Sequence, residues 1–349
     1  MISFIVPVQY KKNNYIYQRA IELISFFEDL TEDVELVISD ASKIKMLHSE
    51  SEKIKIVNLE YTSGIYSPAK ARNACIDYCT KEFLFFLDVD LSFSEIFISS
   101  LFDVIKEKIV FSESQFIMLP CLYLSELGTK EFDNSLNKKK TIALFRDTYI
   151  YGDNTYVERL AINTSAIALR REYFIKIGMF SEDFSGHGGE DFELLHRLAS
   201  YNPHSMKNSD YYHDKVEQFI IDYKGFRQYL SLYSFEYLFS DLLMVHRWHK
   251  RELFNKFYMK RIGNENLLIQ KMKQHDLNDG LWRSNESFVK YKDYLDHLLI
   301  SQGYDLKKAI GFKKLKDEII IKRPLSAKIR KLITRPKLFF IDMLRNKSK

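Results

Sequence analysis

The stretch Glu82-Phe83-Leu84-Phe85-Phe86-Leu87-Asp88-Val89-Asp90 joins five consecutive apolar residues to two carboxylates spaced i, i+2. A short apolar run of this length predicts a fully buried strand. Alternate residues of an extended chain point to the same side, so the side chains of Asp88 and Asp90 can converge on one point. Oxygen ligands of this kind suit Mg²⁺ or Mn²⁺, which in turn suit a diphosphate. The alternative is a strand that ends in a polar turn.

The composition is that of an ordinary globular protein. The chain has 349 residues, of which 46% are hydrophobic and 28% charged, enough for one large domain or two smaller ones. No stretch approaches 18 uncharged apolar residues, and the first residues lack the basic segment and cleavage site of a signal peptide. Cys75, Cys79 and Cys121 lack a matching metal-ligand spacing, so we expect buried, reduced thiols in a cytoplasmic protein.

The first hundred residues alternate between strand and helix patterns. Apolar runs predict strands over residues 3–8, 34–38, 54–59 and 83–87, and helical spacing predicts helices over 13–30 and 69–79. Such alternation is typical of an α/β fold with a mostly parallel central sheet flanked by helices. Ligands bind at the carboxyl ends of the strands in these sheets. We therefore expect Asp40 and the Asp88/Asp90 pair, which follow strands, at one edge of the sheet.

The remainder of the chain is less regular. We expect a helix over residues 94–108, a strand over 116–124 and a return to the sheet at 163–169. Residues 125–160 are polar, which predicts a long, mobile connection of the kind that covers a site. Beyond residue 215 the pattern is mainly helical.

A second group of candidate catalytic side chains follows a glycine-rich turn. The sequence Gly186-His187-Gly188-Gly189-Glu190-Asp191 leads into a helix with a leucine-rich buried face. The glycines allow positive φ and close approach of the backbone. A carboxylate in the first turn of a helix can simply cap it, because the helix dipole favours negative charge there. It can also serve as general base for a hydroxyl, and both Glu190 and Asp191 remain candidates.

Two histidines lie close together in Val245-His246-Arg247-Trp248-His249. Their i, i+3 spacing fits one face of a helix and also fits a loop. Histidine pairs of this kind are common at surfaces and in cores without a metal. If one of them joins the aspartates, an imidazole beside carboxylates favours Mn²⁺ over Mg²⁺.

Taken together and in this order, these motifs resemble the GT-A glycosyltransferases, and among them the inverting family 2 enzymes, including bacterial capsule and chondroitin-type polymerase domains. The likeness covers about residues 2–265. It implies a GT-A domain over 1–265, with a nucleotide-sugar half at about 1–125 and an acceptor half at about 160–265. A helical extension over 266–306 and a basic amphipathic tail over 307–349 would follow.

The resemblance also implies roles for individual residues. Asp88 and Asp90 would hold the metal together with His246 or His249, and Asp191, with Glu190 as the alternative, would be the general base. The residues 8–10, Val-Gln-Tyr, depart from the family's usual opening. The residues expected to contact the donor nucleotide are Pro7, Val8, Tyr10, Asp40, Arg72, Asp88 and Val89.

The mechanism that the resemblance implies is direct displacement at the anomeric carbon. A nucleotide diphosphate leaves while an acceptor hydroxyl attacks from the opposite face, and a metal with nearby cations stabilises the developing charge. The donor would be a UDP-sugar carrying a hexose or N-acetylhexosamine. The acceptor would be a free or lipid-linked surface glycan of capsular or lipopolysaccharide type. Two alternatives remain: a nucleotidyl- or phosphotransferase, although the P-loop motif is absent, and an inactive membrane-peripheral scaffold.

The C-terminal tail differs in charge from the rest of the chain. Residues 307–349 hold 15 Lys/Arg and 3 Asp/Glu, whereas the preceding residues hold 37 and 44. Apolar residues interleave with the basic ones, a pattern that suits an anionic membrane surface or a capsule-assembly complex. A solvated tail or a helix packed on the body is the alternative. We expect no nucleic-acid partner, because nothing resembles a nucleic-acid-binding module.

Overall fold

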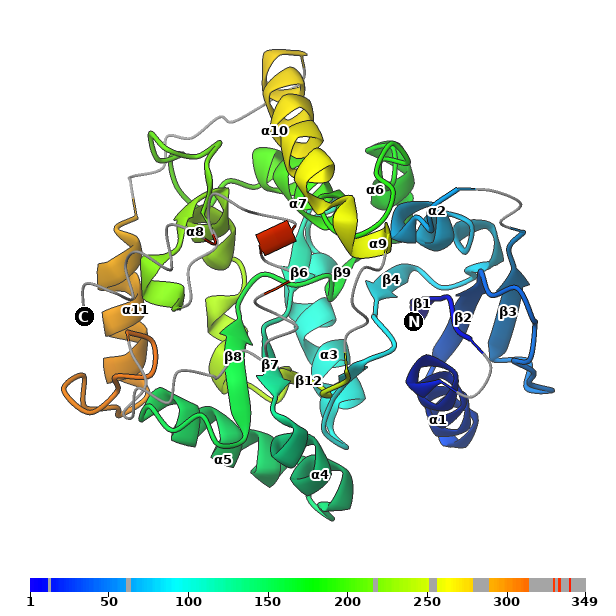
Figure 1. The fold of residues 1–349 in the computed structure, drawn as a ribbon, viewed down its shortest axis with the longest axis horizontal. Helices are drawn as coiled ribbons and strands as arrows, with labels where there is room; N and C mark the ends of the chain where they lie inside the picture. The colour runs from blue at the N-terminus through cyan, green and yellow to red at the C-terminus, as the bar shows by residue number, and fades with distance from the viewer. Residues whose placement is uncertain are drawn as a thin grey trace.

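A six-stranded mixed sheet forms the centre of the fold (Figure 1). The computed structural model describes residues 1–11, 14–60, 64–215, 219–250, 256–278 and 289–313, together with residues 329, 332, 333 and 339. The strands of the central sheet, in spatial order, are β3 (Ile54–Asn58), β2 (Val34–Asp40), β1 (Ile2–Val8), β4 (Phe83–Phe86), β9 (Ile167–Arg170) and β6 (Phe116–Met118). The first four run parallel, whereas β9 runs antiparallel to both of its neighbours. The predicted α/β architecture is confirmed.

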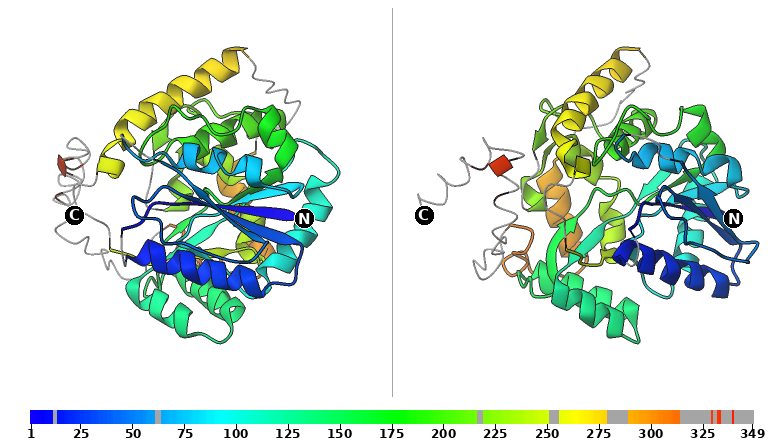
Figure 2. Two further views of the ribbon diagram at one scale, coloured as in Figure 1. Left: turned by 90° about the vertical axis from the view of Figure 1, so that its right-hand side faces the viewer. Right: turned by 45° about the vertical axis from the view of Figure 1, so that its right-hand side comes forward.

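The pleat of β1 distributes its side chains between two cores. Phe4 and Val6 join a cluster formed with α1 (Tyr15–Asp29) and α3 (Phe97–Val104). Ile5 joins a second cluster, formed with α2 (Pro68–Asn73), α7 (Glu190–Tyr201) and α10 (Arg261–Asn278). Successive side chains of a strand point to opposite faces, so both faces of the sheet are covered. Figure 2 shows α1 and α2 on opposite sides of the strands.

A smaller, four-stranded sheet continues from the end of β4. Its strands, in spatial order, are β5 (Leu91–Ser92), β12 (Met244–His246), β7 (Cys121–Leu124) and β8 (Val157–Ala161). β12 runs parallel to β7, and the two other pairs are antiparallel. This sheet brings His246 opposite Leu91, beside the Asp88/Asp90 segment from which it is far removed in sequence. Its other side packs against α5 (Lys138–Ile150) and α11 (Tyr291–Ser301) in a third core.

Two predictions between residues 116 and 160 are wrong. The expected strand over 116–124 is divided into β6 and β7, which belong to different sheets, and Pro120 between them has no N–H to donate to a ladder. Residues 125–160 form α4 (Glu126–Asn134), α5 and β8 in place of a long connection. Ser125 and Asn137 accept backbone N–H bonds at the starts of these helices, which makes the polar segments helix caps.

Other elements follow the sequence pattern closely. The helix expected over 69–79 ends at Asn73 and continues as a 3₁₀ turn, η1 (Ile76–Tyr78), and the one over 94–108 is α3 followed by a π-helical turn, η2 (Ile105–Ile109). The boundary expected at residue 265 falls within α10. The other elements of the described chain are α6 (Arg171–Lys176), β10 (Asp214–Lys215), η3 (Ile220–Asp222), β11 (Lys224–Gly225), α8 (Phe226–Ser231), η4 (Phe235–Phe239) and α9 (Lys256–Met259).

The remaining predictions on composition concern thiols, membrane spans and the tail. The three cysteines are free and buried, and burial raises the pKa of Cys75 and of Cys79 to about 12, so these thiols are protonated at neutral pH. Within the described ranges, every helix is too short or too polar to cross a membrane. Nearly all of the basic tail predicted over 307–349 lies outside the described residues.

Candidate active site

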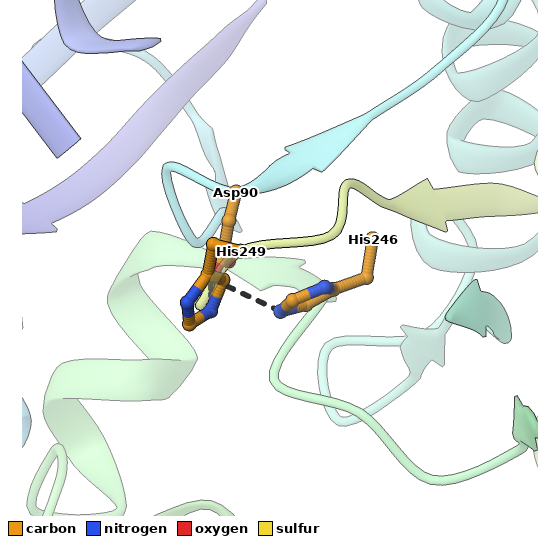
Figure 3. A group of neighbouring side chains, drawn as sticks. All are labelled: Asp90, His246 and His249. Atoms are coloured by element: carbon orange, nitrogen blue, oxygen red, sulfur yellow. Dashed lines mark ion pairs between the residues drawn. The ribbon is translucent and has the colours of Figure 1, made fainter. Parts of the chain in front are cut away.

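One aspartate and two histidines meet where the two sheets adjoin, and we call them the site cluster: Asp90, His246 and His249 (Figure 3). Asp90 Oδ2 lies 3.0 Å from His246 Nε2 and 3.4 Å from His249 Nε2. The potential ligand atoms of all three lie within 4.8 Å of one another. Burial opposes ionisation of Asp90, but the two imidazoles hold the pKa of its carboxyl well below the ordinary value.

The local backbone explains why two histidines three residues apart reach the same carboxylate. His246 ends strand β12, whereas His249 lies in the loop that follows it. Of the helix and the loop that their spacing fits, the structure shows the loop. Arg247 N donates to Asp90 O over 3.0 Å, which joins this loop directly to the aspartate segment. Trp248 is held on both sides, by the Thr129 hydroxyl at its N–H and by Arg19 at its carbonyl.

Each imidazole of the site cluster stacks on a tyrosine. The rings of Tyr123 and His246 are 4.2 Å apart with an interplanar angle of 13°, and those of Tyr15 and His249 are 4.4 Å apart at 15°. These contacts fix the planes of both imidazoles before any ligand arrives. Neither tyrosine was predicted to belong to the site, because a single aromatic residue in the sequence carries no signal of what it stacks on.

Asp88 lies outside the site cluster, although it is only two residues from Asp90. Its Oδ1 accepts a hydrogen bond from Arg72 over 2.8 Å, and its Oδ2 accepts one from the Ser165 hydroxyl over 2.6 Å. The intervening Val89 is partly buried against the apolar core. Ser165, just before β9, was not predicted, and only its place at the start of an expected strand could have indicated it.

Arg72 connects the two groups of carboxylates that the sequence singles out. Its guanidinium is 2% exposed and lies 2.8 Å from Asp88, 2.9 Å from Asp191 and 3.4 Å from Glu190. It also lies over the ring of Phe180, with 5.1 Å between the guanidinium carbon and the ring centroid. A single buried cation therefore holds the end of β4 and the start of α7 around one point.

The glycine turn sets the position of Glu190 and Asp191. Gly188 and Gly189 have φ of 84° and 110°, values that residues other than glycine rarely adopt. A Cβ on Gly189 would also lie 2.6 Å from the ring of Phe184. The turn thereby starts α7 at Glu190, as predicted, with both carboxylates in its first turn.

Glu190 and Asp191 have different surroundings. The Glu190 side chain is 4% exposed, and its buried Oε2 has no hydrogen-bond partner among the residues that the structure describes, whereas the Asp191 side chain is 23% exposed. Burial and the neighbouring charge of Asp191 raise the pKa of Glu190 to about 8. Burial also raises the pKa of Asp191, against the attraction of Arg72. Arg72 donates to both carboxylates, over 2.9 Å to Asp191 and 3.4 Å to Glu190, so a single proton on the pair belongs on Glu190.

The predicted nucleotide contacts at the ends of β1 and β2 lie together. Tyr10 OH donates to Asp40 Oδ2 over 2.8 Å and accepts from Met46 N over 2.7 Å. Asp40 is fully buried, and its Oδ1 accepts from Ser42 N over 2.8 Å. Pro7 is half-buried and Val8 buried beside them. In this arrangement Asp40 and Tyr10 brace the loops at this edge, and direct contact with a base stays a prediction.

Four observations indicate that the site cluster suits a divalent cation. One carboxylate and two imidazoles form its donor set, and this mixture suits Mn²⁺ better than Mg²⁺. The separations of 3.0 and 3.4 Å match neighbouring ligands of an ion with bonds of about 2.1 Å. His249 Nδ1 is buried without a hydrogen-bond partner in the described part of the chain. We find no lysine or arginine ion pair to Asp90 among the described residues that would already neutralise it.

A mainly parallel sheet with carboxylates at the carboxyl end of β4, extended by a small second sheet, is the architecture of the GT-A class of nucleotide-sugar transferases. The chain belongs to the family described as glycosyltransferase like family 2, whose model matches residues 3–274. No curated protein matches the sequence.

Several solved structures of transferases are similar to this chain at low sequence identity. The mannosyltransferase PcManGT from Pyrobaculum calidifontis, in complex with GDP-Man and Mn²⁺, is 12% identical over 88% of this chain and 77% of its own, with a TM-score of 0.38. Glucosyl-3-phosphoglycerate synthase from Mycobacterium tuberculosis is 14% identical over 78% of each chain, with a TM-score of 0.36. S. aureus TarS is 17% identical over 57% of this chain, with a TM-score of 0.32, and this chain spans 33% of the TarS chain.

Proposed function

We propose that this protein is a metal-dependent, inverting glycosyltransferase that moves a sugar from a UDP-sugar to an acceptor hydroxyl. One observation carries the proposal: buried Arg72 joins Asp88, beside the site cluster, to Asp191 at the start of α7. A donor held at the site cluster and a hydroxyl held at Asp191 would then meet at one point. That arrangement suits a single displacement, in which base and leaving group act together on opposite faces of the anomeric carbon.

Asp191 is the general base in this proposal. It is the more exposed of the two candidate carboxylates. Burial raises the pKa of its carboxyl, and the ion pair and hydrogen bond with Arg72 oppose that rise. Glu190 is buried and, because its pKa is raised, protonated at neutral pH, so it cannot accept the proton of an incoming hydroxyl. The raised pKa makes Asp191 a stronger base than an ordinary aspartate, and it still depends on close placement of the acceptor hydroxyl.

Asp90, His246 and His249 would hold the divalent cation, with Mn²⁺ favoured by the two nitrogen ligands. When bound, such a cation neutralises charge that develops on the leaving diphosphate. Asp88 would face the same diphosphate, and Arg72 would keep Asp88 oriented. The stacked tyrosines, Tyr15 and Tyr123, would keep the imidazoles in place during turnover.

The finer assignments rest on the sequence. A hexose or N-acetylhexosamine as the transferred sugar, and a surface glycan of capsular or lipopolysaccharide type as acceptor, are extensions of the proposal drawn from the resemblance of the motifs. Peripheral association with the cytoplasmic face of the membrane is a further extension, supported by the excess of basic residues over 307–349.

Two isosteric variants test the proposal and the choice of base. The purified chain with Mn²⁺ is incubated with a panel of UDP-sugars, and UDP release is measured with simple sugars as acceptors. Asp191→Asn should lower turnover by about 10²–10⁴-fold while leaving UDP affinity unchanged. Glu190→Gln mimics the protonated acid and should be much less damaging. A larger loss in Glu190→Gln would exchange the two roles, and no UDP release from any donor would refute the activity.

A further inference from the structure

A row of three planar side chains crosses the smaller sheet, starting at the site cluster. The strand register places His246 of β12 opposite Tyr123 of β7, and Tyr123 opposite Arg159 of β8. Tyr123 stacks on His246 with 4.2 Å between ring centroids, and the Arg159 guanidinium carbon lies 3.9 Å from the Tyr123 centroid. Directly paired residues of neighbouring strands share one face of a sheet. All three groups therefore lie on the face that carries the site cluster.

The positions of these three side chains on neighbouring strands set the distance between Arg159 and the proposed metal site. Neighbouring strands are about 4.8 Å apart, so Arg159 lies about 10 Å from His246, measured across the strands. This separates it from the diphosphate that the site cluster would hold. β8 is an edge strand, and its pairing with β7 is irregular between Tyr123 and Leu124, next to the Arg159 pair. Such bulges re-aim side chains and are frequent beside active sites.

Arg159 differs from the other arginines around the site in how its charge is balanced. Arg72 is surrounded by three carboxylates, and Arg247 pairs with Glu22 at 2.7 Å and with Asp133 at 3.5 Å. Arg159 is exposed and, within the described ranges, forms no ion pair with a carboxylate; its neighbours are Tyr123, on whose ring it lies and with which it shares a hydrogen bond, and Tyr223. The fold therefore holds a guanidinium in a defined plane without a carboxylate among the described residues to neutralise it.

We propose that Arg159 binds an anionic group, a carboxylate or a phosphate, carried by one of the two sugar substrates. The inference rests on the proposed function, because it assumes that a donor and an acceptor meet at the site cluster. A planar guanidinium matches carboxylate and phosphate groups with two parallel hydrogen bonds, and stacking on Tyr123 reduces the freedom lost on binding. The charged group can lie on the acceptor or on the transferred sugar, as in a uronic acid.

Two matched pairs of probes test the proposal by calorimetry with Mn²⁺. UDP-glucuronic acid is compared with UDP-glucose for the donor, and N-acetylglucosamine 6-phosphate with N-acetylglucosamine, in the presence of UDP, for the acceptor. The wild type should prefer the charged member of one pair, and that pair identifies the substrate that carries the anion. Arg159→Met, which keeps an unbranched stem and removes the guanidinium, should weaken the charged member by about 10- to 100-fold and leave the neutral one unchanged.

The controls separate this inference from a supporting role and from the proposed activity. Mn²⁺ affinity should be the same in Arg159→Met as in the wild type; a loss would mean that Arg159 only orients His246 through Tyr123. No preference for a charged probe in either pair, or equal weakening of both members, would also overturn the inference. UDP release is measured in parallel. Turnover without any Arg159-dependent preference for a charged probe would keep the proposed function and remove this inference, whereas Arg159-dependent binding of a charged probe without turnover would do the reverse.

Discussion

The part of the chain that the structure describes contains two clusters of one aspartate and two histidines, and we expect only one of them to bind a metal. In the site cluster, Asp90 Oδ2 lies 3.0 and 3.4 Å from two imidazole nitrogens. In the second, which we call the helix cluster (Asp276, His196 and His275), Asp276 Oδ1 lies 3.0 Å from His196 Nε2 and 3.6 Å from His275 Nδ1. The two clusters have the same residue types and nearly the same distances, so neither residue type nor distance alone identifies a metal site.

The difference lies in the other oxygen of each aspartate. Asp276 Oδ2 accepts hydrogen bonds from Lys207 Nζ, over 2.6 Å, and from the hydroxyl of Tyr212. The helix cluster thus already contains its cation, and a divalent ion would have to compete with a lysine. The ion pairs of Asp90 within the described part of the chain are with His246 and His249 alone. A carboxylate without a permanent cationic partner is therefore the better indicator of a metal site.

The two clusters also differ in what they connect. The site cluster joins segments around an open edge of the sheet, whereas the helix cluster joins α7 to α10 beside the apolar contacts of Leu268 and Met272. Tyr211 holds the other nitrogen of His196, with 3.0 Å between its hydroxyl and Nδ1. Since α7 begins with Glu190 and Asp191, the helix cluster anchors the helix that carries the proposed base.

The largest expected effect is on metal binding and turnover. Asp90→Asn should raise the dissociation constant for Mn²⁺ by more than about 100-fold and reduce UDP release by about 1,000-fold or more, because it removes the anionic ligand. Mn²⁺ binding is measured by the loss of its free electron paramagnetic resonance signal on titration with protein.

The matched control is the same substitution in the other cluster. Asp276→Asn should leave the number of bound Mn²⁺ ions and their affinity unchanged. A second bound ion in the wild type that disappears in Asp276→Asn would show that the helix cluster binds metal despite Lys207, and the comparison would fail.

The second effect is on stability, and here the substitution in the helix cluster should cost more than the one in the site cluster. Asp276→Asn leaves Lys207 without its carboxylate in a half-buried position, which should lower the free energy of unfolding by about 3–5 kcal/mol. Asp90→Asn should lower it by less than Asp276→Asn does when no metal is present, because no lysine loses its partner there. Urea unfolding followed by circular dichroism measures both variants. Lys207→Met combined with Asp276→Asn should recover part of the loss, and no recovery would place the cost elsewhere than in this ion pair.

Most of the central fold could be predicted from the sequence, for a physical reason. The apolar run at 83–87 and the alternation around it are local patterns, and a strand buried on both faces must be apolar throughout. The prediction of a long connection over 125–160 was wrong because the helices there bury few side chains, such as Phe132 and Phe145. These helices begin at the capping residues Ser125 and Asn137. A polar helix with few buried residues resembles a loop in sequence.

The candidate site could be predicted only as a set of chemical groups. Asp90, His246, Asp191 and Arg72 were each singled out by local motifs, but the sequence assigned Asp88 to the metal, and the structure places it between Arg72 and Ser165. The partners of a carboxylate depend on which strand ends lie side by side in the fold, and local sequence patterns carry no information about that. The stacking of Tyr123 and Arg159 beside His246 requires the register of three strands, and only the structure supplies it.

The smallest effect concerns the contribution of His196, in the helix cluster, to the pH dependence of stability. Glu190, whose pKa is raised to about 8, contributes over the same range with the opposite sign, so the His196 contribution is read from a difference between variants. Burial lowers the pKa of His196 below its ordinary value, against the attraction of Asp276. The folded protein therefore takes up this proton less readily than the unfolded chain, so stability is lost as pH falls below about 6.5, by up to about 1.4 kcal/mol per pH unit. The pKa of Asp276 is lowered as well, because His196 and Lys207 outweigh burial, and its contribution is lost only below about pH 4.

Urea unfolding at pH 7.5, 6.5 and 5.5 isolates this contribution when His196→Gln is measured beside the wild type. The variant lacks the imidazole that titrates, so its stability does not depend on this proton. The difference in unfolding free energy between the two proteins should therefore shrink as the pH falls. Because the helix cluster already holds Lys207 as its cation, the same slope is expected with Mn²⁺ and with a chelator. Parallel curves over this range would mean that His196 binds its proton equally well in the folded and unfolded states, and the predicted contribution would be absent. A slope that changes with Mn²⁺ would mean that a metal reaches the helix cluster, and the contrast between the two aspartates would have to be abandoned.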